Sequence, residues 1–190
     1  MNKKVLVTIA DGIEEIEAVC IIDVLRRAGS DVTVAAVGDS LQITASRGVV
    51  LVAARLIKQC KDISYDLIAL PGGMPGAENL RDCTILINML KKQKTSGRYY
   101  AAICASPAVV FAACGLLEGC NATCYPSFIK KLPNHIDEKV VVDNNCITSQ
   151  GPGTALLFSL KLVEILYGAE KAKGIADAMA EQWDDIYVEV

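Results

Sequence analysis

The chain has 190 residues, of which 52% are hydrophobic and 22% are charged, and its formal net charge is -3. This composition supports one sizeable hydrophobic core, so we expect residues 1–190 to form a single domain. The small negative charge and the lack of a lysine and arginine stripe exclude a typical nucleic-acid-binding protein. No stretch approaches the roughly 18 apolar residues that span a bilayer, and no export signal is recognisable. We therefore expect a cytoplasmic protein that binds neither nucleic acid nor membrane.

Short β-branched runs alternate with helical patterns along the chain, which is typical of a parallel sheet covered by helices. In chain order the patterns predict a strand at Lys4–Ala10, a helix at Glu14–Ala28, strands at Asp31–Val37 and Val49–Val52, a helix at Arg55–Cys60, a strand at Asp66–Leu70, a helix at Thr84–Ser96, a strand at Tyr99–Ile103, a helix at Pro107–Gly115, strands at Val140–Val142 and Cys146–Ser149, and helices at Thr154–Gly168 and Glu170–Ala180. The strands at 49–52 and 140–142 are expected at the periphery. This order predicts an α/β fold with a mostly parallel, doubly wound sheet and helices on both faces.

Unusual residues follow four of the predicted strands. These turns are Asp11-Gly12, Pro71-Gly72-Gly73, Cys104-Ala105-Ser106-Pro107 and Gln150-Gly151-Pro152-Gly153. Turn chemistry alone would explain each of them. In a doubly wound sheet, however, ligands bind beyond the carboxyl ends of the strands. Four such turns converging on one edge predict a functional site there.

Cys104 ends an apolar strand and directly precedes Ser106-Pro107, a good N-cap followed by proline at the first helical position. A strand, a nucleophile and a helix in this order form a nucleophile elbow, which exposes the reactive side chain. The N–H groups of the following helix favour the thiolate, so we expect a lowered pKa for Cys104. The alternative is an inert, buried structural cysteine.

Glu17 falls on the apolar side of the first predicted helix. The apolar stripe of that helix consists of Ile13, Cys20, Val24 and Ala28. Glu14 lies at the edge of the stripe and Glu15 on the polar side, so both can be solvated. A buried Glu17 would have a raised pKa, and its protonated form could donate a hydrogen bond to a thiolate. The alternative is that Glu17 reaches the surface or caps a backbone group.

The eight cysteines are scattered and contain no C-x-x-C pair. In a chain without a recognisable export signal, we expect them to be reduced and mostly buried. A zinc site is not expected, because the chain has a single histidine and no closely spaced ligand pairs. We expect no metal and no cofactor.

Six stretches together resemble one known family. They are Gly12-Ile-Glu-Glu-Ile-Glu17, Arg26-Arg27-Ala28-Gly29, Ser46-Arg47-Gly48-Val49, Leu70-Pro71-Gly72-Gly73, Ala101-Ala-Ile-Cys104-Ala-Ser-Pro107 and Thr148-Ser-Gln-Gly-Pro-Gly-Thr154. With these stretches in family order over nearly its whole length, the chain resembles the ThiJ/PfpI superfamily. Within this superfamily it resembles the branch of the parkinsonism-associated protein deglycase and its bacterial homologues.

The resemblance implies a flavodoxin-like three-layer sandwich and a homodimer. It makes Cys104 the nucleophile, hydrogen-bonded to a protonated Glu17. It also implies an anion pocket formed by the backbone N–H groups of Gly72, Gly73 and Ala105. The resemblance also places Tyr125, Pro126 and Arg27 near the pocket. Arg47 of the partner subunit, the arginine of the Ser-Arg-Gly stretch, is expected there too. Without the resemblance, Arg27 and Arg47 would be read equally well as solvated surface charges.

The chain departs from the family pattern at three positions. Ala105 stands where peptidase-like relatives have a histidine, so a Cys-His dyad at the elbow is absent. Tyr125 precedes Pro126 where the deglycase has a histidine, which puts a histidine-dependent step in doubt. Ser106 replaces a glycine common in the family.

The resemblance implies an enzyme of the glyoxalase or protein deglycase type, which acts on small reactive carbonyls or on glycated protein groups without glutathione. One alternative is an oxidative-stress sensor or redox-regulated chaperone that works through oxidation of Cys104. A more remote alternative is a cysteine peptidase or amidotransferase-like hydrolase. That chemistry would need His135, oriented by Asp137, to reach Cys104, whereas we expect His135 to be a solvated loop residue.

Overall fold

The structure, a computed structural model, describes residues 2–181 and 188–189. The strands of its main sheet are β1 (Lys4–Ile9), β2 (Asp31–Ala36), β5 (Arg55–Leu56), β6 (Leu67–Leu70), β7 (Tyr99–Ile103), β8 (Val140–Asp143), β9 (Cys146–Ser149) and β10 (Val188–Glu189). Their order across the sheet is β10-β8-β9-β7-β6-β1-β2-β5, and only the pair β8–β9 is antiparallel. The predicted mostly parallel sheet is confirmed.

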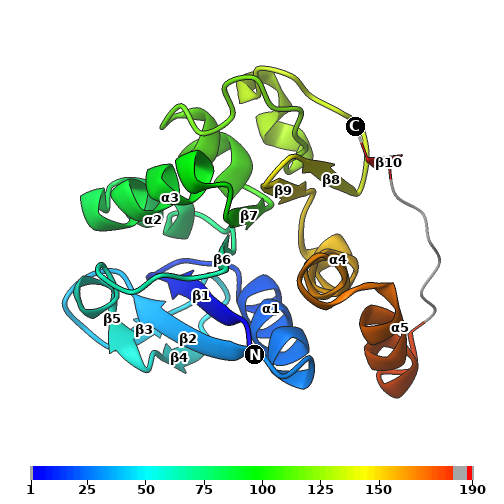
Figure 1. Cartoon of the computed structure of the whole chain (residues 1–190). Coiled ribbons are helices and arrows are strands. Elements are labelled where there is room, and N and C mark those ends of the chain that lie inside the picture. Colours follow the sequence, from blue (N-terminus) through cyan, green and yellow to red (C-terminus); the bar gives the residue numbers. More distant parts are fainter. Residues whose placement is uncertain (1, 182–187, 190) are drawn as a thin grey trace.

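Helices cover both faces of this sheet, as predicted (Figure 1). On one face α1 (Glu15–Arg27) packs against α4 (Ala155–Tyr167), and α5 (Ala169–Ala178) packs on the outer side of α4. On the other face lie α2 (Gly76–Arg81) and α3 (Thr84–Ser96), and the segment η2 (Pro107–Ala112) packs against α2. Three short 3₁₀ turns complete the described helices: η1 (Ile57–Gln59), η3 (Pro126–Lys131) and η4 (Pro152–Thr154).

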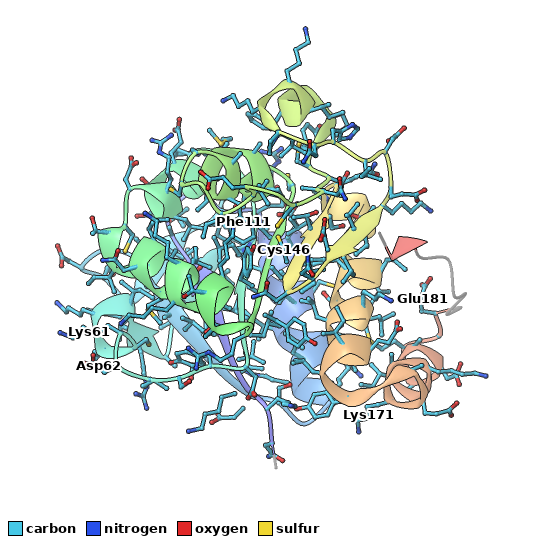
Figure 2. All side chains as sticks on the ribbon, turned by 45° about the horizontal axis from the view of Figure 1, so that its top comes forward. Lys61, Asp62, Phe111, Cys146, Lys171 and Glu181 are labelled. Carbon is cyan, nitrogen blue, oxygen red and sulfur yellow. The ribbon has the colours of Figure 1, made fainter. Side chains whose placement is uncertain are left out.

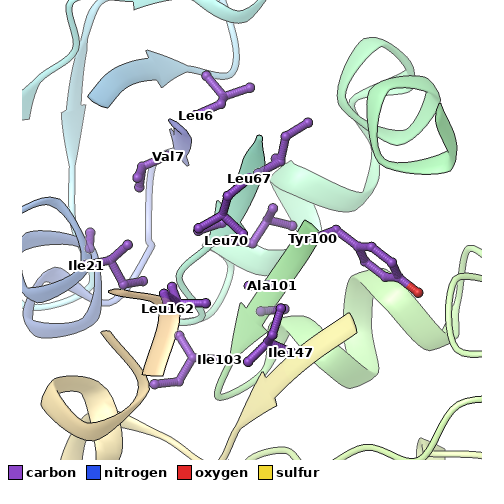
Figure 3. Close-up of a cluster of buried hydrophobic side chains, with 14 of the residues drawn as sticks. Leu6, Val7, Ile21, Leu67, Leu70, Tyr100, Ala101, Ile103, Ile147 and Leu162 are labelled. Carbon is purple, nitrogen blue, oxygen red and sulfur yellow. The ribbon is translucent and has the colours of Figure 1, made fainter. Parts of the chain in front are cut away.

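The central strands are apolar on both sides because helices cover both faces of the sheet. All four residues of β6 are buried, as are the last five of β1. Figure 3 shows the inner part of this core, in which Ile21 of α1 and Leu162 of α4 point toward the strands. Phe111 and Cys146 lie inside the molecule, whereas charged side chains such as Lys61 and Lys171 extend from its periphery (Figure 2). None of the helices in residues 2–181 combines the length and the apolar character needed to cross a bilayer.

One predicted element near the N-terminal edge is wrong, and another is confirmed but lies outside the main sheet. The expected helix at 55–60 begins as strand β5, because Ala35 and Ala36 of β2 pair with Arg55 and Leu56, and only the turn η1 follows. The expected strand at 49–52 is confirmed as β4 (Val50–Val52), but it lies outside the main sheet. It pairs antiparallel with β3 (Gln42–Thr44), which the sequence patterns missed together with α2.

The segment after β7 also differs from the predicted α-helix. Residues 107–112 form a wide π-helical turn, in which the Leu116 N–H donates to the Phe111 carbonyl at 2.9 Å. Turns rather than a regular helix continue the chain to Gly115. The helix that directly follows the predicted elbow is therefore only six residues long.

Candidate active site

Cys104 stands at the carboxyl end of β7, in the middle of the sheet. Its backbone has a φ of 65°, which a residue with a side chain rarely adopts. Two bonds to other elements hold this conformation: the Cys104 N–H donates to the Ser149 carbonyl at 3.0 Å, and the Cys104 carbonyl accepts from the Tyr125 N–H at 2.8 Å. A strained residue between a strand and a helical turn is the geometry expected of a nucleophile elbow.

Ser106 fixes the elbow in a way that the sequence did not predict. Its hydroxyl makes no N-cap hydrogen bond. It donates instead to the carbonyl oxygen of Pro71 at 2.6 Å, and the side chain is fully buried. Ser106 thus stands at the predicted N-cap position, directly before Pro107, but makes no capping bond. Its hydroxyl ties the elbow to the loop that follows the neighbouring strand β6.

Glu17 reaches the elbow from α1 and is fully buried. Its Oε2 accepts a hydrogen bond from the Gly72 N–H at 2.6 Å. Burial raises the pKa of Glu17 to about 7, although the bonds from Gly72 and Cys104 oppose the shift. Oε1 has no hydrogen-bond partner among the described residues. The thiol of Cys104 and the carboxyl of Glu17 each affect the pKa of the other, so the two side chains are neighbours.

Position 72 requires glycine because the loop after β6 lies very close to the turn at Cys104 and Ala105. A Cβ at Gly72 would lie 2.6 Å from the Cβ of Cys104 and 2.8 Å from the nitrogen of Ala105. The structure corrects the expected role of this residue. Because the Gly72 N–H is donated to Glu17, it holds the acid and is not free to bind an anion in the pocket.

The thiol of Cys104 does not have the lowered pKa that the sequence predicted. Burial and the neighbouring carboxylate of Glu17 raise the pKa of the thiol to about 12. The N–H groups of Gly73 and Ala105 contact the sulfur and act in the opposite direction. Two peptide N–H groups and a six-residue helical turn supply too little positive potential to offset burial. These two groups are the part of the expected anion pocket that faces Cys104.

A pocket of about 280 Å³ opens above the thiol. Its lining consists of Glu14, Ser46, Arg47, Gly73, Met74, Cys104, Ala105, Tyr125, Phe128 and Pro152. The structure thus brings Arg47 of the same chain to the pocket. Arg27 is not among the lining residues and instead forms an exposed ion pair with Asp23 at 2.6 Å. Pro126 begins the turn η3 behind Tyr125 and does not line the pocket.

Two acids at the start of α1 were wrongly expected to be solvated. Glu14 and Glu15 are 8% and 7% exposed. The loop between β3 and β4 covers them, and Ser46 in that loop hydrogen-bonds to both carboxylates. Sequence periodicity missed Glu14 and Ser46 as pocket residues because the covering loop is distant in sequence. The Ser-Arg-Gly stretch was the one signal that pointed to it.

The remaining titratable candidates lie apart from the pocket. His135 does not line it, and is half-buried rather than solvated, with an Nε2 that has no partner among the described residues. All eight cysteines are free thiols. Within residues 2–181 and 188–189, no three His, Cys, Asp or Glu side chains are grouped so that they could hold a metal ion.

The site therefore combines a thiol, a neighbouring buried carboxyl and two N–H groups at the sulfur. In such a site the thiol can attack an electrophilic carbon, the two N–H groups can stabilise the oxyanion that forms, and the carboxyl can move a proton within the adduct.

Comparison with known proteins gives consistent matches over most of the chain. A family model described as "DJ-1/PfpI family" matches residues 3–165. The chain is 54% identical over 177 residues to "Protein DJ-1 homolog B" of Arabidopsis thaliana, a match that covers 92% of the chain and 40% of that protein. It is 37% identical over 167 residues to "Glutathione-independent glyoxalase DJR-1.2" of Caenorhabditis elegans, with 85% of the chain and 87% of that protein covered.

Solved structures agree with this similarity. The structure described as "Toxoplasma gondii DJ-1, oxidized" superposes with a TM-score of 0.94 at 49% identity, covering 95% of this chain and 100% of that one. The chain spans less than half the length of the two Arabidopsis relatives, 40% and 45%.

Proposed function

Because the chain belongs to the DJ-1/PfpI family, we propose that it is a cysteine-dependent enzyme acting on small reactive carbonyls, of the glyoxalase or protein deglycase type. The observation that carries this proposal is the pairing of Cys104, which lines a small pocket, with the buried carboxyl of Glu17. The name of the Caenorhabditis elegans relative as a glutathione-independent glyoxalase supports the choice of substrate class.

The proposed reaction starts with proton transfer from the thiol to Glu17. With a Glu17 pKa of about 7 and a thiol pKa of about 12, the carboxylate holds no proton and the thiol holds one at slightly alkaline pH. Glu17 removes that proton as the sulfur attacks the aldehyde carbon of methylglyoxal. The N–H groups of Gly73 and Ala105 stabilise the oxyanion of the resulting hemithioacetal.

Glu17 gives the proton that it took from the thiol to this oxyanion, which becomes a hydroxyl. The regenerated carboxylate then removes the proton from the former aldehyde carbon and delivers it to the neighbouring ketone carbon, while the hydroxyl proton passes to the ketone oxygen. The first carbon is oxidised to a thioester and the second is reduced to an alcohol, so no external oxidant or reductant is consumed. Water hydrolyses the thioester, releases lactate and returns the proton to the thiol. Glyoxal would give glycolate by the same steps, and the proposed substrates include the adducts of these aldehydes with protein amines or thiols.

The test is lactate formation from methylglyoxal by purified protein without glutathione. We expect Cys104→Ala and Glu17→Ala to lose the activity, while a matched substitution at a remote acid, Glu170→Gln, retains it. Equal lactate formation by all four proteins would end the proposal.

A second candidate, a sensor or redox-regulated chaperone, is favoured by the donors around the sulfur. The N–H groups of Gly73 and Ala105 would also bind the oxygens of a sulfinate at Cys104. The raised thiol pKa argues against fast oxidation. Peptide mass spectrometry after mild peroxide separates the two functions, because a sensor requires Cys104 to oxidise before the other seven cysteines.

The homodimer remains part of the proposal. Ile16 and Val19 on α1 and Val50 and Val52 on β4 are each about half exposed or more, at 58%, 47%, 52% and 69%. A groove of about 430 Å³ between these elements contains Val19 and Val52. Exposed apolar side chains gathered in this way are typical of an interface, and light scattering of the purified protein tests it.

A further inference from the structure

The turn at Ser46 and Arg47 forms one wall of the Cys104 pocket. Backbone hydrogen bonds attach this turn to the loop that leads into α1. The Ser46 N–H donates to the Ile13 carbonyl, and the Gly12 N–H donates to the Thr44 carbonyl, both at 2.8 Å. These bonds fix both ends of the turn but leave the N–H of Arg47 without a backbone acceptor among those described.

Glu15 supplies that acceptor. Its two carboxylate oxygens accept from the Arg47 N–H at 2.9 and 3.2 Å, and Oε2 also accepts from the Ser46 hydroxyl at 3.0 Å. The side chain is 7% exposed. Burial alone would raise the pKa of Glu15, but the hydrogen bonds at its own backbone, Ser46 and Arg47 outweigh it and lower the pKa. Glu15 is therefore an ionised carboxylate whose bonds go to this turn.

Glu14 has a different position although it is the next residue in the chain. It lines the pocket, and its Oε2 accepts from the same Ser46 hydroxyl at 3.1 Å. A hydroxyl has one proton, so Ser46 donates to only one of the two carboxylates at a time. Glu15, which does not line the pocket, is thus the acid that holds Arg47.

We propose that Glu15 is a positioning residue: it fixes Arg47 at the mouth of the Cys104 pocket, where the guanidinium makes the site favour anionic electrophiles over neutral ones of the same size. Arg47 supplies positive charge to this mouth, and Glu14 on the same wall opposes it. Any effect on turnover rests on the proposed carbonyl chemistry, whereas the effect on the reactivity of the thiol does not.

Alkylation of Cys104 by iodoacetate and by iodoacetamide tests the proposal. In both reactions the sulfur forms a bond to carbon, the carbon–iodine bond breaks and iodide leaves. The ratio of the two rates cancels the fraction of thiolate and reports the local charge. Peptide mass spectrometry separates Cys104 from the other seven cysteines. We expect Arg47→Ala to lower the iodoacetate-to-iodoacetamide ratio by about fivefold, the effect of one unit charge roughly 4 Å away in water.

Glu15→Ala removes both acceptors of the Arg47 N–H, whereas glutamine would keep one. Glu15→Ala should lower the ratio by a similar factor, and should add nothing in an Arg47→Ala background. The direction is decisive, because simple loss of a negative charge near the pocket would raise the ratio. Glu14→Gln should raise it for that reason, and Glu170→Gln, which removes an acid from the first turn of α5, should leave it unchanged.

A ratio that rises or stays constant in Glu15→Ala overturns the proposal, as does a further decrease in the Arg47→Ala background. Glu15→Asp keeps the charge at the start of α1 but shortens the reach to the Arg47 N–H. It is the second variant if Glu15→Ala does not fold, and an unchanged ratio there also overturns the proposal. A protein that makes no lactate from methylglyoxal but shows these ratios would refute the proposed function alone.

Discussion

Replacement of Glu17 by glutamine should stabilise the protein, by an amount that grows with pH. Glu17 is fully buried, and burial raises its pKa from the ordinary 4.5 to about 7. The folded state therefore binds this proton more tightly than the unfolded state does. The contribution of Glu17 to the free energy of unfolding is largest below pH 4.5, falls as the pH rises from 4.5 to 7, and is constant above that range.

The size of the effect follows from the same shift. A difference of about 2.5 pKa units corresponds to about 3 kcal/mol, which the ionised Glu17 costs above pH 7. Glutamine keeps the shape of the neutral acid and can still accept from the Gly72 N–H, but it never ionises. We expect Glu17→Gln to be more stable than the natural chain by about 3 kcal/mol at pH 8, and by close to nothing at pH 4.5.

Urea unfolding in reducing buffer between pH 4.5 and 8 measures this difference. Thermal unfolding should show the same trend, at about 2–4 °C for each kcal/mol in a chain of this size. Glu15→Gln is the contrasting variant. Because the pKa of Glu15 is lowered, its ionised form stabilises the fold, so the variant should be less stable at pH 8 and approach the natural chain as the pH falls. A stability difference for Glu17→Gln that does not change with pH would refute the reasoning.

Three further predictions follow from the same geometry. Lactate formation should rise with pH through about 7, where Glu17 ionises. The reason is that the active form of the Cys104–Glu17 pair holds one proton, whichever of the two side chains carries it. A rate profile that is flat between about pH 5.5 and 8.5 contradicts this. Ser106→Ala removes the donor to the buried Pro71 carbonyl and should cost about 1–3 kcal/mol in urea unfolding, with a matching loss of activity. Gly72→Ala forces a Cβ to within 2.6 Å of the Cβ of the nucleophile and should destabilise by at least about 1–3 kcal/mol, whereas Gly174→Ala on α5, with no atom within 4 Å, should stabilise by up to about 1 kcal/mol.

Local sequence signals predicted the scaffold of the site. The apolar run that ends at Cys104 predicted β7 with its observed bounds, and the pattern at 84–96 predicted α3 in the same way. The position of Glu17 on an apolar helix face predicted its burial and the direction of its pKa shift. These signals are reliable because periodicity and turn chemistry depend on neighbouring residues, which the chain keeps together whatever else it contacts.

Contacts between distant segments decided the rest. The short strand β5 exists because β2 offers it an edge, although its own sequence resembles a helix. The tertiary structure also assigned Gly72 to the acid, Ser106 to the loop after β6 and Glu15 to Arg47, pairs that are 55, 35 and 32 residues apart.

The sequence by itself thus determined the layered fold and placed a cysteine and a buried carboxyl at one edge of the sheet. Only the tertiary structure decided how protons and charges are distributed there. A pKa depends on how much water is excluded and on which dipoles point at the group, and both are set by the segments that pack around it. For that reason the expected low pKa of Cys104 gave way to a raised one, while the raised pKa of Glu17 remained.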